Sequence, residues 1–151
     1  MTSFSLTGSD TITINLRPLK DLADDDITSV SFPNEICVVA TGKNRNTVYA
    51  LNESGNNAEM TLRVLMNSSD DKFLNGLLAA QQADLPSFTL ITGSFTKRVG
   101  DGNGKVSYNT YPLQGGVFTK LPDVKDNVNG DKEQAIITYN LKFALAPRVL
   151  A

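Results

Sequence analysis

Two acidic segments have side chains that bind cations, but neither has the necessary spacing. Residues 24–26 are consecutive aspartates. Their side chains point in different directions, whereas a hard-cation site needs oxygens that converge from spaced positions. The segment 101–105 begins like a calcium loop, but Lys105 takes a ligand position and Pro112 stands where a bidentate glutamate belongs. We therefore expect a solvated acidic loop at residues 24–26 and a tight turn at residues 101–105.

The residues needed for nucleophilic or nucleotide chemistry are also missing. The chain has no histidine, which removes the Ser-His and Cys-His pairs and the commonest general base and metal ligand. Gly100, Gly102 and Gly104 do not form a GxGxxG motif, and no predicted helix follows them to hold a pyrophosphate. The single cysteine, Cys37, fits either a reducing compartment or an inert thiol in the core. We expect no enzymatic activity, no cofactor and no metal site.

The composition is typical of one globular domain. The chain has 151 residues, of which 40% are hydrophobic and 20% are charged, so it is long enough to bury a core. A formal net charge of -2 argues against a broad nucleic-acid-binding face. No apolar run approaches the roughly 18 residues of a membrane span, and residues 1–4 do not open a secretory signal. We expect a single domain over residues 1–151, soluble, made in the cytoplasm and without membrane insertion.

The clearest structural pattern is a strand followed directly by a helix. In residues 58–66, apolar side chains alternate with polar ones, with Met60, Leu62, Val64 and Met66 on the buried side. Asparagine, serine and aspartate residues then favour the start of a helix, which is predicted over about residues 69–82. The apolar face of that helix is expected to pack in the core and consists of Phe73, Leu74, Leu77 and Leu78.

The rest of the chain reads as short strands separated by turns. A strand at residues 10–17 alternates with Ile12, Ile14 and Leu16 inward, and a strand at residues 136–145 alternates up to Leu145. Further strands are expected at residues 30–41, interrupted by Pro33, and within 87–99, 105–108 and 115–120. We predict a mainly β fold, a β-sandwich or rolled barrel of antiparallel strands with one flanking helix.

A long excursion separates two of the expected core strands. Residues 42–57 are rich in asparagine and glycine and enclose a short β-prone run at residues 47–51. The segment is longer than most hairpins need, so we predict a protruding hairpin over about residues 42–57. Such an arm docks on another molecule or, alternatively, is a mobile surface loop.

The order of these segments resembles the tail tube proteins of contractile-tailed bacteriophages across nearly the whole chain. Those proteins are similar in architecture to the tube protein of type VI secretion. The resemblance is carried by strand and turn residues rather than by a catalytic signature. These are Phe4-Ser5-Leu6 before Thr11-Ile12-Thr13-Ile14; Thr61-Leu62-Arg63-Val64-Leu65 before Asn67-Ser68-Ser69 and a helix with Leu74; and Phe118-Thr119-Lys120-Leu121-Pro122-Asp123 before Gly130-Asp131-Lys132-Glu133 and a final strand.

The resemblance implies a structural virion protein with six copies in a ring and rings stacked into a hollow tail tube that the genome passes through. Its partners would be copies of itself, the tail sheath, the baseplate and the tape-measure protein, with only transient, non-specific passage of DNA. It implies assembly in the host cytoplasm and a place in the virion tail. The hairpin would reach the adjacent ring, through Lys43, Asn44, Arg45, Asn46, Thr47, Tyr49, Asn52, Glu53 and Asn56. The alternative is a monomeric β-sandwich that binds a ligand, or an adhesin-like module.

Overall fold

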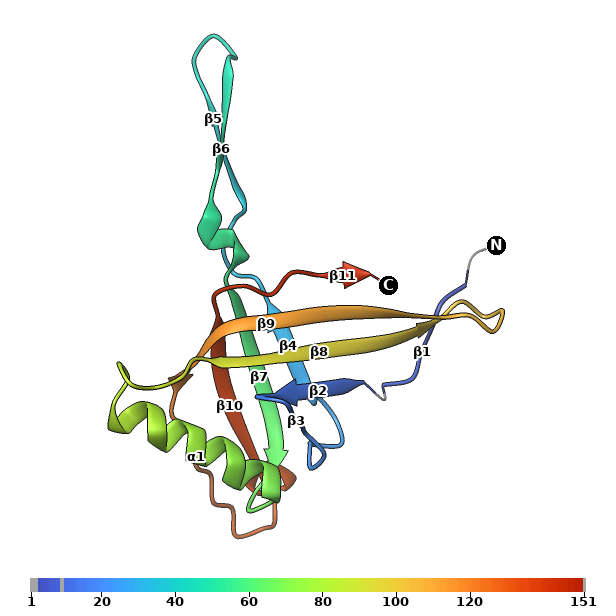
Figure 1. The fold of residues 1–151 in the computed structure, drawn as a ribbon, viewed down its shortest axis with the longest axis vertical. Coiled ribbons are helices and arrows are strands. Elements are labelled where there is room, and N and C mark those ends of the chain that lie inside the picture. The colour runs from blue at the N-terminus through green and yellow to red at the C-terminus, as the bar shows by residue number, and fades with distance from the viewer. Residues whose placement is uncertain (1–2, 9, 151) are drawn as a thin grey trace.

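The computed structural model describes residues 3–8 and 10–150, and it is mainly β with one α-helix (Figure 1). In chain order the elements are β1 (Ser5–Leu6), β2 (Thr11–Ile14), β3 (Arg17–Pro18), β4 (Thr28–Ser31), β5 (Cys37–Thr41), β6 (Thr47–Leu51), the short 3-10 helix η1 (Glu53–Asn56), β7 (Ala58–Leu65), α1 (Ser69–Ala83), β8 (Ile91–Gly100), β9 (Val106–Lys120), the 3-10 helix η2 (Lys132–Ala135), β10 (Ile136–Phe143) and β11 (Val149–Leu150).

All strands except β5 and β6 form one large antiparallel sheet that folds over itself, and β5 and β6 form a separate two-stranded sheet. The order of the large sheet is β3-β2-β8-β9-β10-β7-β4, with β1 also paired to β8 and β11 also paired to β9. The long strand β9 belongs to both halves, because its first part pairs with β8 and its last part pairs with β10. Buried side chains from both halves pack into a single core. The predicted sandwich of antiparallel strands with one helix is confirmed.

Strand β9 corrects one prediction, since the strands expected at residues 105–108 and 115–120 are one continuous element. The register with β8 shifts between Ile91 and Gly93, where one extra residue of β9 is accommodated. Gly115 lies at this point with φ +67°, a conformation that glycine adopts without strain. Gly115 and Gly116 therefore mark a bulge within β9 rather than the beginning of a new strand.

The strand and helix at the centre of the chain form as predicted. Met60, Leu62 and Val64 of β7 are buried, and Leu74 and Leu78 of α1 pack in the same core. Ser68 caps the helix by accepting a hydrogen bond from the amide of Asp71 at 3.2 Å. Phe73 and Leu77 are partly buried against the core, and Gln81 bonds both the amide and the carbonyl of Phe118 at 2.8 Å. The helix is thus fixed to both halves of the sheet.

Three residues predicted to point inward do not. Leu16 is 93% exposed, because Asn15 and Leu16 form a two-residue turn with φ values of 49° and 68° between β2 and β3. The Asn15 amide donates to Thr92 O at 2.7 Å, and its side chain accepts from the Thr92 amide, so the turn is held from the side. Met66 and Leu145 lie just past the ends of β7 and β10 and are exposed. In each case the alternation continues in sequence beyond the end of the regular strand, although Met66 and Leu145 still form backbone hydrogen bonds with Ala135 and Gln114.

The protruding hairpin exists, but its boundaries differ from the prediction. Residues 35–41 were expected to form a core strand, whereas β5 pairs only with β6 and leaves the body of the protein (Figure 1). The segment 42–46 is the turn at the far end. We refer to residues 36–52 as the arm and to the other described residues as the body. Cys37 is on the arm and exposed, so the expectation of a core thiol is wrong.

Candidate assembly surface

The arm has apolar side chains on both of its faces. Its strands pair from Cys37 opposite Leu51 to Thr41 opposite Thr47. Since opposite residues of an antiparallel pair point to the same side, Val39 and Tyr49 lie on one face. The other face carries Val38 with Ala50 and Ala40 with Val48. The arm strands contain no charged residue.

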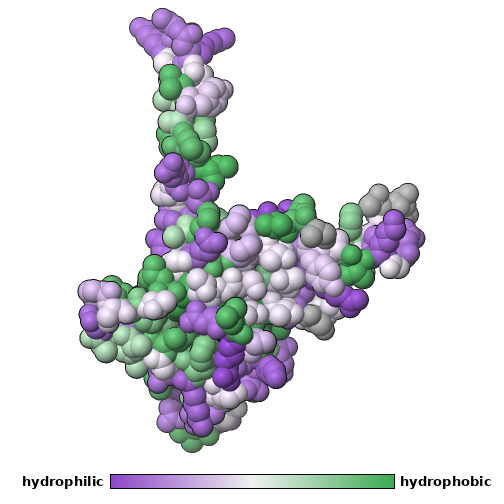
Figure 2. All heavy atoms as spheres, viewed as in Figure 1, coloured by the Kyte–Doolittle hydropathy of each residue, from purple (hydrophilic) through white to green (hydrophobic). Residues whose placement is uncertain are grey.

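These apolar side chains are open to solvent. Figure 2 shows a hydrophobic band along the arm between a hydrophilic tip and a hydrophilic root. A two-stranded hairpin alone is only marginally stable in water, and contiguous exposed apolar surface marks an interaction site. The large apolar residues of the arm are 47–80% exposed and are Ile36, Val38, Val39, Val48, Tyr49 and Leu51.

The root of the arm is closed by hydrogen bonds and packs closely against the body. The Asn52 amide donates to Ile36 O at 2.9 Å, and the Asn52 side-chain amide donates to Glu35 O at 2.8 Å. Gly55 packs directly beneath, where a Cβ would lie 2.7 Å from both Glu35 O and the Ile36 Cα. Asn34 adds a bond from its side chain to Ser54 O at 3.2 Å. The direction in which the arm projects is therefore fixed by backbone contacts.

The tip of the arm is basic. The turn closes through Gly42 N donating to Asn46 O at 2.8 Å and Arg45 N donating to Gly42 O at 3.0 Å. Lys43 and Arg45 are exposed on it, and no carboxylate occurs between residues 36 and 52. The tip therefore presents two cations that have no anionic neighbour along the arm.

The residues predicted for the inter-ring contact fall into four places. Lys43, Asn44, Arg45 and Asn46 form the turn, and Thr47 and Tyr49 lie on β6. Asn52 is part of the root. Glu53 and Asn56 belong to η1 in the body and not to the arm. The sequence prediction missed the apolar residues of β5, which form half of the exposed surface.

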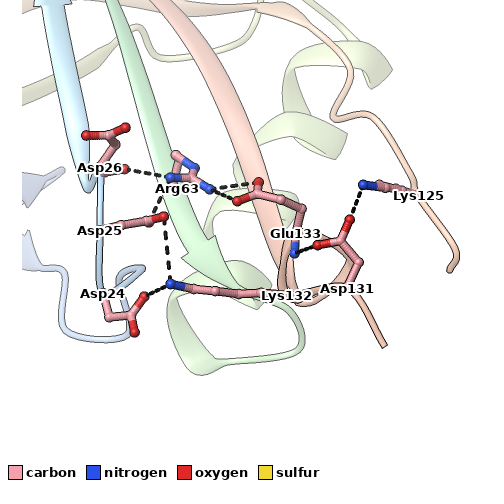
Figure 3. A network of polar contacts seen from close by, with 8 residues as sticks. All are labelled: Asp24, Asp25, Asp26, Arg63, Lys125, Asp131, Lys132 and Glu133. Atoms are coloured by element: carbon pink, nitrogen blue, oxygen red, sulfur yellow. Dashed lines mark hydrogen bonds and ion pairs between the residues drawn. The ribbon is translucent and has the colours of Figure 1, made fainter. Parts of the chain in front are cut away.

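The opposite end of the molecule carries a network of ion pairs (Figure 3). Arg63 at the end of β7 contacts Asp25 at 2.8 Å and both carboxylate oxygens of Glu133 at 2.8 Å. Lys132 pairs with Asp24, and also lies 3.7 Å from Asp25. Residues 24–26 are exposed and form a loop, as predicted, but Asp24 and Asp25 also pair with cations from distant segments of the chain.

The charges of this network shift the pKa values of its members. The hydrogen bond from Lys132 lowers the pKa of Asp24, and the same bond raises the pKa of Lys132. Likewise, Lys125 lowers the pKa of Asp131, and that bond raises the pKa of Lys125. The bond with Glu133 raises the pKa of Arg63. All of these groups remain in their charged forms near neutral pH.

Asp70 is the one buried charged residue of the described chain. Its carboxylate accepts from the amides of Lys20 at 2.5 Å and Asp21 at 2.7 Å, and Arg17 lies 3.4 Å away. The group is fully partnered, so it anchors the segment after β3 to the start of α1. No group of three histidine, cysteine or acidic side chains in the described residues could hold a metal ion, and no helix there is long and apolar enough to cross a membrane.

Several grooves occur on the body, and two of them contain exposed apolar residues that are relevant to binding. The side groove, of about 590 Å³, lies where β1 and β11 flank the β8–β9 pair and is lined by Phe4, Val99, Tyr108, Arg148 and Leu150, among others. The base groove, of about 400 Å³, lies at the start of α1. Its lining includes Met66, Asp71, Pro122, Val124 and Ile137.

The outer face of the β4–β7–β10 part of the sheet is polar. A hollow on it is lined by Ser29, Ser31, Thr61, Thr119 and Asn140, together with a few longer side chains. Strand β4 is the last strand in the sheet order, and it contains no charged residue or proline. Its outer edge is therefore a free template for pairing with another chain.

No protein-family model matches the chain, and a search of the curated proteins finds no match. A function must therefore be inferred from the chain's own surfaces.

Proposed function

We propose that this chain is a structural subunit that assembles with copies of itself into stacked rings, six to a ring, which form the hollow inner tail tube of a bacteriophage. The observation that carries the proposal is the arm, a hairpin that is apolar on both faces and fixed at its root. Such an arm is stabilised only when other molecules bury its apolar faces.

The two faces of the arm favour a polymer over a simple pair. Val39 and Tyr49 on one face and Val38 and Val48 on the other would both have to be buried. One partner surface covers one face, whereas an arm inserted into a wall of subunits is covered on both. The contact joins different surfaces of each copy, and such heterologous contacts generate rings or filaments.

The edge and the polar face of the sheet fit the same proposal. Closure of a ring would pair the free edge of β4, as closed barrels remove exposed edges in general. The hollow around Ser29, Thr61 and Asn140 is lined mainly by hydroxyl and amide side chains, and the charges of Glu59 and Lys120 on it are of opposite sign. A conduit for DNA needs such a wall, because a basic wall would hold the polyanion through counterion release. The net charge of -2 is compatible with transient passage.

The remaining elements of the proposal follow from the tail-tube resemblance. The tube would lie in the virion tail after assembly in the host cytoplasm, inside a contractile sheath, and would contact the baseplate and the tape-measure protein. The role is structural and requires no catalytic residue.

Electron microscopy and sedimentation of the purified chain test this function. The wild type is expected to form rings and tubes. A variant in which Cys37–Leu51 is replaced by a short Gly-Ser turn should keep the melting temperature of the body and form no long tubes. Small, uniform particles of the wild type at every concentration would contradict the proposal.

The side groove favours a second candidate, a monomeric ligand-binding or adhesin-like module. Its volume of about 590 Å³ is within the usual range for small-ligand sites, and Tyr108 with Arg148 offers both stacking and charge. Under this alternative the wild type stays monomeric, the arm deletion has no effect on assembly, and Arg148→Ala abolishes ligand binding.

A further inference from the structure

We propose that the base groove of one copy receives the arm tip of the next copy, so that the copies join head to tail. This inference rests on the proposed tube function and names the surface that the arm contacts. The groove is apolar at Met66, Pro122, Val124 and Ile137, and Val124 is among the most exposed large apolar residues of the body.

The arm cannot reach the base groove of its own chain. Strand β7 begins at the root of the arm and runs to the other end of the molecule, where α1 starts (Figure 1). Its eight residues span roughly 23 Å at 3.3 Å per residue. Met66, which lines the groove, follows β7 directly. A contact between arm and groove therefore joins two copies through different surfaces, and such a contact can repeat from copy to copy as an open stack.

Apolar side chains are available on both partners. Val48 and Tyr49 are the exposed large apolar residues nearest the tip. An aromatic side chain that enters an apolar groove is the commonest kind of interface anchor. Tyr49 is therefore expected to be the anchor of the contact, with Val124 and Met66 as its neighbours in the groove.

The charges of the two ends are complementary. The tip carries Lys43 and Arg45, and no acid lies on the arm. The loop that borders the groove carries Asp123 before Val124, and Lys125 and Asp126 after it, all exposed. Lys125 is paired with Asp131, and Lys72 also lines the groove. Asp123 pairs with Lys120 at 2.9 Å, a surface contact that exchanges readily.

The ion-pair network at the same end of the molecule also has more negative than positive charges. The network of Figure 3 contains five carboxylates and only three cations. A basic tip is attracted to such an end, and two basic tips repel each other. The charges therefore select the head-to-tail pairing against the tip-to-tip one.

Charge reversal with rescue tests this contact. Lys43→Glu with Arg45→Glu, or Asp123→Lys with Asp126→Lys, should each reduce sedimentable tubes at least about tenfold, because like charges in an interface are strongly unfavourable. Both sets combined should restore the tubes. The matched control, Arg98→Glu with Lys105→Glu on the β8–β9 end, should leave tube formation within about twofold of the wild type. Thermal unfolding of each monomer confirms that the body is folded.

Disulfide trapping provides a second measurement. In a Cys37→Ser background, oxidised tubes of Arg45→Cys with Val124→Cys should give a ladder of covalent multimers, whereas Arg45→Cys with Lys105→Cys should not. Wild-type tubes without this ladder, and without an effect of the Asp123 and Asp126 reversals, would overturn the inference but leave the proposed function intact. A wild type that forms no tubes would overturn both.

Discussion

The arm and the far end of the β8–β9 hairpin both project from the rest of the molecule, but only the β8–β9 hairpin is paired with further strands of its own chain (Figure 1). Strand β1 pairs with β8 at Val99 and Gly100, and β11 pairs with β9 at Asn109 and Thr110. The β8–β9 hairpin is thus covered on both edges. In the described residues no other strand pairs with β5 or β6.

The exposed side chains of the two hairpins also differ in polarity. The far end of the β8–β9 hairpin carries Arg98, Asp101 and Lys105, the charged residues that keep an exposed edge from pairing. The arm strands have valine, tyrosine and leucine in the corresponding exposed positions. The comparison shows one projection whose strand edges are paired by other strands of the same chain and one whose strand edges, among the described residues, are not.

Amide exchange in the monomer is expected to show the largest difference between the two hairpins. Core strands open only with the global unfolding free energy of about 5–15 kcal/mol, whereas an isolated hairpin opens at almost no cost. Amides of β5 and β6 should therefore exchange more than about a thousandfold faster than those of β8 and β9 near Leu113. In tubes the arm should become protected. Equal protection of both hairpins in the monomer would remove the distinction.

The same substitution in the two hairpins should separate folding from assembly. Leu113 of β9 is 1% exposed and Leu51 of β6 is 80% exposed. Leu113→Ala should lower the free energy of unfolding by about 2–5 kcal/mol, because it leaves a cavity. Leu51→Ala should change it by less than about 0.5 kcal/mol but reduce the yield of tubes. Denaturant unfolding and sedimentation measure the two effects, and a large stability loss in Leu51→Ala would mean that the body covers the arm.

The sequence predicts those elements whose signals are local. The alternation of β7 and the cap and apolar face of α1 all lie within a few residues of each other, and both elements form where expected. The burial of Leu16 was predicted wrongly because a turn at Asn15 ends the strand while the apolar pattern continues in sequence. The ion pairs of Arg63 escape it as well, since Asp25 and Glu133 are distant in the chain.

The arm was only partly predictable for a different reason. Its turn and β6 stand in an asparagine- and glycine-rich segment, which marked them as protruding. Strand β5 is a run of apolar residues, and such a run has the same pattern whether it is covered by its own fold or by another molecule. Only the pairing of β5 with β6 alone distinguishes the two cases.

Gly55→Ala should affect the arm without unfolding the body. The added Cβ would meet backbone atoms of Glu35 and Ile36 at 2.7 Å, so the root has to shift. Overpacking of this kind costs roughly 1–3 kcal/mol, and here it can be relieved by a change in the direction of the arm. We expect a melting temperature within a few degrees of the wild type and a marked loss of long tubes.

Gly76→Ala on α1, where no atom lies within 4 Å of the new Cβ, is the control. Normal tubes from Gly55→Ala would show that the direction of the arm is not critical.

Acid titration should have the smallest effect and should act on the body alone. Asp24 and Asp131 have pKa values lowered from 3.8 in the folded chain by Lys132 and Lys125, so folding favours their charged forms. Their stabilisation is therefore complete above about pH 5 and is lost as the pH falls through the lowered values. The raised pKa values of Lys125 and Lys132 reflect stabilisation that is fully present below their ordinary value of 10.5 and is lost only as the pH rises through the raised values. The melting temperature of Asp24→Asn with Asp131→Asn should lie slightly below that of the wild type between about pH 6 and pH 9, and the two should converge near about pH 2.

The arm has no carboxylate, so its amide signals should not follow this titration. A difference that grows on acidification would show that these carboxylates do not stabilise the fold through their ion pairs.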